Sequence, residues 1–426
     1  MAEVAAGAIA AEQVLSTTIE AGAASYAVGK PSNGLKVTLN QLATAAADGT
    51  SNSLVRSNHT LTVVGDRAYI FGGQTDSGKI ATNDIHSFAL PTADEPQSDY
   101  HLTPAISFET GTQVPAPRTG HSACALGGRL VVFGGLDESG KVLQEETIWL
   151  YDPQKSAWKA ASPASSTTTP SRRSKAKIFP HGENLLLYGG NDEVGTSLTD
   201  VWEFDFSSQT WARLPNAPVS TTSAAFAEGS LYLIAATDGL SSVLYHLDIA
   251  SQSSEQSDEP PTWVTTQFPT NPLVPGPRPR ENGGLLHVTT GFGRSYLLYF
   301  LGDRQPGSLS ETSTGPPLQW SDIWSLQLPA SQLSVQRTTT ISEAIKPAKI
   351  KDAIRSRLGY DTGTFSWAEA EVAPPGDLPE PEGKVHPGPR SSFGCDVLAN
   401  KRDVVLWGGI NAKGEREGDG WIIHLQ

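Results

Sequence analysis

The chain has 426 residues with 41 glycines, 30 prolines and ten tryptophans, and its charged fraction of 18% lies below the roughly 25% of typical globular domains. This turn-rich, charge-poor composition favours an all-β fold. The net charge of −14 argues against broad electrostatic binding to nucleic acid or an anionic membrane. No apolar run reaches the length of a transmembrane helix. The two cysteines, Cys124 and Cys395, form neither a disulfide framework nor a zinc cluster, so we expect a cytoplasmic protein.

Residues 1–53 form an N-terminal extension in this interpretation. Its first part is rich in alanine, and a strand is predicted at about residues 34–42. There Leu35, Val37 and Leu39 alternate with polar residues, which is the period of a strand with one buried face.

From about residue 54 onward, one motif recurs: a polar turn, a short apolar run and a pair of glycines. Complete copies end at Gly73, Gly135, Gly190 and Gly409. Two degenerate copies carry Ala235-Ala236 or Gly302 alone. A constant motif at uneven spacing indicates a repeated unit with long loops inserted into it.

Each copy also has flanking strands. A first strand, often opened by arginine, precedes the apolar run. A third strand contains an aromatic residue, and a tryptophan follows seven positions later, as in the pairs Tyr151/Trp158 and Phe204/Trp211. The unit therefore has four strands.

This four-strand pattern resembles the Kelch repeat, whose units are the blades of a β-propeller. The resemblance implies an all-β, six-bladed Kelch-type β-propeller over residues 54–426. The expected blades are 54–115, 116–163, 170–217, 218–270, 276–375 and 388–426. The physics agrees, because a lone four-stranded sheet cannot bury both of its faces. The sixth copy ends at Gln426 after three strands, so we predict that the N-terminal strand closes the last blade.

An arginine opens the first strand of five copies, and radial symmetry predicts that these side chains converge near the central channel. We call this face, which also carries the loops between second and third strands, the top. Converging guanidinium groups could bind an anionic ligand, or each could brace neighbouring carbonyls and carboxylates. The candidate ligand-binding residues are Arg56, Arg118, Arg173, Arg280 and Arg390.

The fifth copy contains an insertion at 328–364 with helical spacing and a local charge of about +3. It is either a docking helix for an acidic partner or a membrane, or a helix packed on the underside of the propeller. The candidate docking residues are Lys349, Lys351, Arg355 and Arg357.

Among Kelch proteins, the nitrile-specifier type is distantly similar and holds iron with Glu, Asp and His spaced four apart. That spacing is absent here, because Glu95 and Asp99 are followed by Thr103. We therefore expect no bound metal and no cofactor.

Two functions stay open, and no catalytic motif is found for either. The first is a non-enzymatic binding or scaffold protein that presents its top-face loops to a protein partner. The second is a small-molecule-binding accessory or tailoring protein of a metabolic pathway, with an anionic ligand at an arginine-lined channel mouth. In both cases we expect a monomer without nucleic acid.

Overall fold

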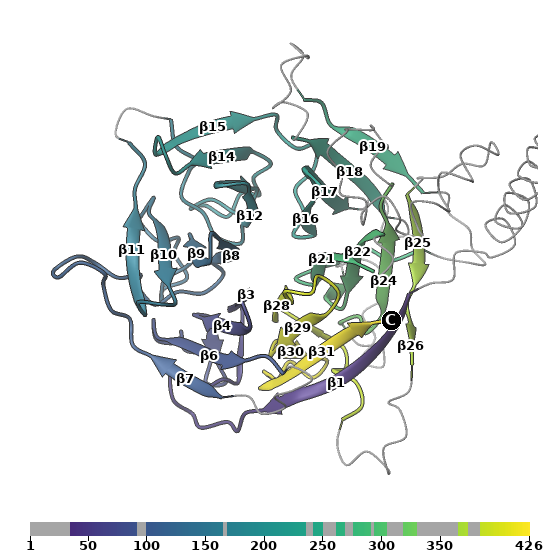
Figure 1. Ribbon diagram of the computed structural model, residues 1–426, viewed down its shortest axis with the longest axis horizontal. Helices are drawn as coiled ribbons and strands as arrows, with labels where there is room; N and C mark the ends of the chain where they lie inside the picture. The colour runs from purple at the N-terminus through teal and green to yellow at the C-terminus, as the bar shows by residue number, and fades with distance from the viewer. Residues whose placement is uncertain are drawn as a thin grey trace, which may run out of the picture.

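The computed structural model describes residues 35–91, 99–164, 168–235, 242–249, 261–268, 276–290, 294–304, 318–329, 365–373 and 384–426. Every regular element in these ranges is a β-strand. Six sheets stand around a central opening as the blades of a propeller (Figure 1). The all-β, six-bladed fold predicted from the repeat is confirmed. The described ranges contain no helix with the length and hydropathy to cross a bilayer.

Five blades are four-stranded antiparallel sheets whose strands run outward from the centre in chain order. Blades 1 and 5 each have two further short strands outside the sheet. Blade 1 holds β3 (Thr60–Val64), β4 (Arg67–Phe71), β6 (Ile85–Ala89) and β7 (Tyr100–Thr103). Blade 2 holds β8 (Ser122–Leu126), β9 (Arg129–Phe133), β10 (Ile148–Asp152) and β11 (Ala157–Ala161). Blade 3 holds β12 (Lys177–His181), β13 (Asn184–Tyr188), β14 (Val201–Asp205) and β15 (Thr210–Leu214). Blade 4 holds β16 (Ala224–Ala227), β17 (Ser230–Ala235), β18 (Val243–Asp248) and β19 (Val264–Gln267). Blade 5 holds β21 (Gly284–Thr289), β22 (Ser295–Phe300), β24 (Ile323–Gln327) and β25 (Ser366–Glu369).

Blade 6 joins the two ends of the described chain. It holds β28 (Gly394–Val397), β29 (Val404–Trp407) and β31 (Asp419–Leu425), with β1 (Lys36–Thr44) antiparallel to β31. In Figure 1 the purple β1 lies beside the yellow β31. Val37 and Leu39 of β1 are buried, so the predicted closing strand is confirmed. A further two-residue strand, β26 (Glu371–Val372), pairs in parallel with the outer edge of β1, which the sequence did not predict.

Six apolar clusters of described residues fill the seams between neighbouring blades. The alternation along each strand explains how one strand serves two seams. In β9, Val131 and Phe133 face blade 3, whereas Leu130 and Val132 face blade 1. Each blade is thus stabilised only by its two neighbours, which makes the ring the unit of stability.

The arginine segment is separated from the innermost strand by a sharp turn. The sequence motif predicts one continuous first strand, but the second residue after each arginine has a positive φ. These residues are Asn58 (φ 53°), Gly120 (60°), Lys175 (54°), Asn282 (52°) and Ser392 (57°). Three of the arginine segments form short ladders above the blades, namely β2 (Arg56–Ser57) with β5 (Gln74–Thr75), β20 (Arg280–Glu281) with β23 (Asp303–Arg304), and β27 (Arg390–Ser391) with β30 (Ile410–Asn411).

Candidate functional site

The five arginines of the repeat are fully buried, with 0–1% of each residue exposed. Each guanidinium group donates to the carbonyl that ends the second strand of its own blade. The pairs are Arg56–Gly72 (3.1 Å), Arg118–Gly134 (3.1 Å), Arg173–Gly189 (2.9 Å), Arg280–Leu301 (3.1 Å) and Arg390–Gly408 (3.1 Å). The glycine doublet therefore presents a carbonyl to the arginine.

Four of the five arginines also bind a carboxylate at short range. The ion pairs are Arg118–Glu145 (2.6 Å), Arg173–Asp200 (2.6 Å), Arg280–Asp322 (2.7 Å) and Arg390–Asp419 (2.6 Å). Both oxygens of Asp200 accept from Arg173, which is the strong forked geometry. Burial raises the pKa of Asp200, but the hydrogen bonds from Arg173 and Trp202 outweigh it and lower that pKa overall.

The carboxylate is held in turn by the indole of a tryptophan in the third strand. Trp202 donates to Asp200, Trp324 to Asp322, Trp421 to Asp419, and Trp149 to Glu145. This arginine–carboxylate–tryptophan chain was not predicted from the sequence. A signal was present, since Asp-x-Trp recurs at 200–202, 322–324 and 419–421.

Blade 1 departs from this arrangement, because His86 occupies the tryptophan position. The Arg56 Nη2 lies 3.0 Å from the His86 Nε2, and the His86 Nδ1 lies 2.8 Å from the Tyr100 hydroxyl. Burial lowers the pKa of His86 to about 3, and the charge on Arg56 adds to this effect. The imidazole therefore accepts from Arg56 as a neutral group.

The backbone of each arginine segment links its blade to the preceding one. The carbonyl of Arg118 accepts the Gly73 N–H at 2.8 Å, and the carbonyl of Arg56 accepts the Gly409 N–H at 2.9 Å. Equivalent bonds join Gly135 to Arg173 (3.1 Å) and Gly302 to Arg390 (2.8 Å). A Cβ on Gly72 would lie 2.5 Å from the Arg118 carbonyl oxygen, so the first glycine of the doublet allows this close approach.

These contacts bear on the ligand-binding hypothesis. The guanidinium groups point into their own blades, and none of the five arginines lines the central cavity. Most of their donors are engaged by carbonyls and, in four blades, by carboxylates, whereas the Arg118 Nη2 has no hydrogen-bond partner among the described residues. This geometry favours the bracing interpretation, and ligand binding by these arginines stays a prediction. Residues 1–34 and 330–364, which include the four candidate docking residues, lie outside the described residues.

The innermost strands surround a central cavity of about 600 Å³. Its titratable lining includes Lys177, Asp396 and both cysteines. The Asp396 oxygens accept the N–H groups of Val63 (2.8 Å) and Val397 (2.7 Å), while burial raises the pKa of this carboxyl to about 6. Burial also raises the pKa of the Cys395 thiol to about 12, so the thiol is protonated at neutral pH. The sequence did not point to Lys177 or Asp396, because each is a single charged residue on a short strand and belongs to no spaced motif.

His59 and His121 lie where blade seams meet the cavity. The His121 Nε2 is 2.9 Å from the Thr60 hydroxyl, and its ring packs edge-on against Phe71. Burial lowers the pKa of His121 to about 3 and lowers the pKa of His59 as well. Both rings are neutral packing groups. In the part of the chain that the structure describes, no three His, Cys, Asp or Glu side chains gather as a metal site would require.

The top-face loops are built as braced turns. Asp137 and Asp192 each accept backbone N–H groups two and four residues later, and the Asn411 side chain does the same. The loops of blades 2 and 3 are also tied together, because Glu193 accepts from Gln144 at 3.3 Å. Short polar side chains that bind their own backbone fix such turns.

Comparisons with known proteins agree with this fold. Residues 35–235 match the family model described as the KLHDC2/KLHL20/DRC7 Kelch-repeats domain. The solved structure titled "Structure of YjhT" aligns with a TM-score of 0.51 at 14% identity, over 87% of this chain and 97% of that chain. At this identity the similarity concerns the fold alone.

Curated relatives each match about a third of this chain. Human Kelch domain-containing protein 3 is 29% identical over 167 residues, which is 37% of this chain and 40% of that protein. Dynein regulatory complex subunit 7 of Chlamydomonas reinhardtii is 30% identical over 139 residues, which is 32% of this chain and 11% of that protein. N-(sulfonatooxy)prop-2-enimidothioate sulfolyase of Thlaspi arvense is 26% identical over 166 residues, which is 38% of this chain and 44% of that protein. The matched region spans less than half the length of each of these relatives.

Proposed function

We propose that this chain, which belongs to the Kelch-repeat β-propeller family, is a non-enzymatic scaffold that presents its top-face loops to a protein partner. The proposal fits what loops on a rigid scaffold commonly do. It also fits a relative whose name places it in a multiprotein assembly, the dynein regulatory complex.

One observation carries the proposal: an apolar side chain is held out in solvent at the tip of a braced loop. Val194 is 86% exposed, more than any other large apolar residue among those described. Its own N–H donates to the Asp192 carboxylate at 3.0 Å, which fixes the turn beneath it. Burying such a side chain against a partner gains apolar contact without ordering a loop.

The alternative, a small anionic ligand at an arginine-lined channel mouth, has less support. It needs guanidinium donors that are free to meet a ligand. The Arg173 and Arg390 forks instead bind Asp200 and Asp419, so an incoming anion would have to compete with a carboxylate already in place.

The test compares two valines with the same substitution. Val194→Asp alters the top face, whereas Val264→Asp alters β19 on the outer rim, where Val264 is 47% exposed. Tagged protein is cross-linked in extract of its source cells, and captured proteins are quantified by mass spectrometry. We expect a set of proteins retained by wild type and Val264→Asp but lost by Val194→Asp. Equal capture by both variants would remove the top face from consideration.

A further inference from the structure

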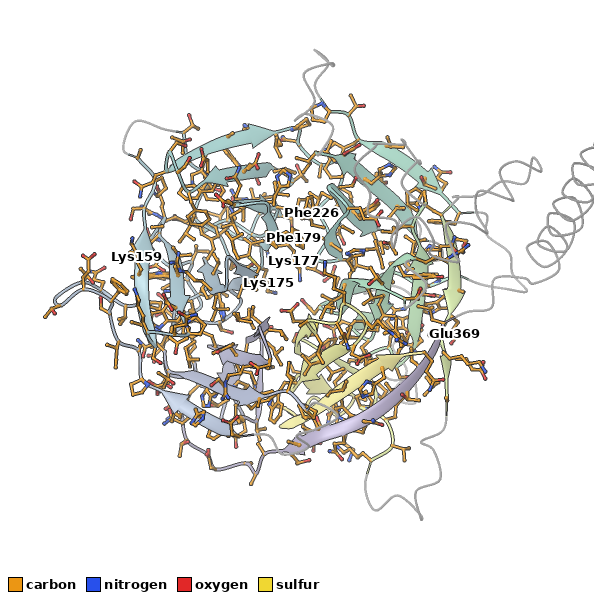
Figure 2. All side chains as sticks on the ribbon, viewed as in Figure 1. Lys159, Lys175, Lys177, Phe179, Phe226 and Glu369 are labelled. Atoms are coloured by element: carbon orange, nitrogen blue, oxygen red, sulfur yellow. The ribbon has the colours of Figure 1, made fainter. Side chains whose placement is uncertain are left out.

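One lysine of the innermost strands faces the central cavity. Lys177 begins β12, and Figure 2 shows it at the central opening together with Phe179 and Phe226. Lys159, by contrast, lies on the outer rim of blade 2 in the same view. The cavity volume of about 600 Å³ is within the range of small-molecule sites, roughly 300–1,000 Å³.

The ammonium group of Lys177 has no counter-charge. Within the described residues, its Nζ has neither an ion pair nor a hydrogen-bond acceptor, whereas four of the five buried repeat arginines have a carboxylate. Burial lowers the pKa of Lys177. In the described part of the chain, the one titratable side chain that counteracts this shift is Cys395 of blade 6, across the ring. Lys177 is half-buried at the cavity wall, and an anionic ligand in the cavity would supply the counter-charge that its ammonium group lacks.

The cavity's own carboxylate is engaged elsewhere. Asp396 accepts the N–H groups of Val63 and Val397, which places its charge against the wall between blades 6 and 1. The wall near Lys177 is apolar instead. Phe179 and Phe226 lie with ring centroids 6.5 Å apart, and both line the cavity with Ala224.

We propose that the central cavity binds a small organic acid with an aromatic or apolar body. Its carboxylate pairs with the Lys177 Nζ, and its body packs against Phe179 and Phe226. This site lies inside the ring, so it goes beyond the scaffold function of the top-face loops and does not depend on it.

The test uses the full chain and two probes of the same shape. Phenylacetate carries the carboxylate, and phenylacetamide replaces it with a neutral amide. Binding is measured by calorimetry and by the shift in melting temperature. We expect phenylacetate to bind with a dissociation constant of about 1 mM or tighter, and phenylacetamide to bind at least about tenfold more weakly.

Variants then assign the charge to one residue. Lys177→Met should lose phenylacetate binding by about tenfold or more, Lys177→Arg should restore most of it, and Lys159→Met should bind like wild type. The two-probe comparison on wild type decides the matter even if Lys177→Met does not fold. The proposal is overturned if neither probe binds, if both bind equally, or if a folded Lys177→Met binds phenylacetate like wild type.

Discussion

At the scale of single residues, each repeat arginine stabilises its own blade through the side chain and the seam with the preceding blade through the backbone carbonyl. The Arg118 guanidinium donates to Gly134 in its own blade, while its carbonyl accepts from Gly73 of blade 1. Recognising arginine at this position was possible from the sequence alone. The direction of the arginine side chain could not be predicted, because the motif does not indicate whether the carboxylate partner lies in the same blade or across the channel.

Replacing Arg118 should therefore cost stability. Arg118→Met removes the guanidinium donor of the Gly134 carbonyl and leaves the Glu145 carboxylate with the Trp149 indole alone, and breaking a buried pair costs about 3–5 kcal/mol. Arg118→Lys should recover little, since an ammonium lacks the fork. Arg129→Met, at a side chain 54% exposed, should change the free energy of unfolding by less than about 0.5 kcal/mol. Urea denaturation measures all three, and a near-neutral Arg118→Met would contradict the bracing role.

Buried histidines should make stability depend on pH. Burial lowers the pKa of His86 and His121 to about 3, and the unfolded side chains titrate near 6.5. The unfolded chain thus binds protons that the native ring excludes. Stability is full above about pH 6.5 and is lost as the pH falls toward 3, by about 1.4 kcal/mol per pH unit for each histidine. Asp396, whose pKa burial raises to about 6, opposes this loss below pH 6.

The measurement is urea denaturation across this pH range, with His121→Gln as the comparison. In the variant, the slope of the free energy of unfolding against pH should be smaller by the contribution of about one proton. An unchanged slope would mean that His121 is protonated in the native protein.

At the scale of the element, the closing strand was readable because its alternation survives in the sequence. Leu35, Val37 and Leu39 are all buried, as a period of two requires. The partner strand β26 was not readable, because Glu371-Val372 is too short to carry any period. The Asp-x-Trp chain shows a different failure: its spacing was visible, but its role depends on the arginine from another strand.

Two adjacent substitutions test the closing strand. Leu39→Asp places a charge in the buried face of β1, whereas Asn40→Asp adds the same charge on the exposed face. We expect Leu39→Asp to lower the melting temperature strongly or to yield insoluble protein, because an unpaired buried carboxylate is costly. Asn40→Asp should behave like wild type. Differential scanning calorimetry compares the two, and similar curves would argue against a stabilising role for β1.

At the scale of the whole molecule, blade 4 is joined to its two neighbours differently from the other blades. Blade 4 has neither the arginine nor the glycine doublet, and Ser223 instead donates from its hydroxyl to the Arg280 carbonyl at 3.0 Å. The two losses belong together, because in the other blades the doublet contacts arginines on both sides. Its N–H donates to the arginine carbonyl of the following blade, and its carbonyl accepts from the guanidinium group of its own blade.

Hydrogen exchange should show that blade 4 opens more readily. Backbone amides of residues 219–235 should exchange faster than those of residues 118–133, the equivalent part of blade 2, because local opening follows the weakest contacts. Peptide-level mass spectrometry makes the comparison under native conditions. Equal protection of the two segments would show that side-chain packing alone holds blade 4.

The pairing of β1 with β31 has a mechanical consequence. The strands are antiparallel, and Val37 lies opposite Leu425 while the Gln426 N–H donates to the Lys36 carbonyl. Residues 36 and 426 therefore leave the sheet at the same end. A tether pulling them apart would load the hydrogen bonds one pair after another, as in unzipping, rather than all together in shear. Under force the propeller would therefore open first at blade 6.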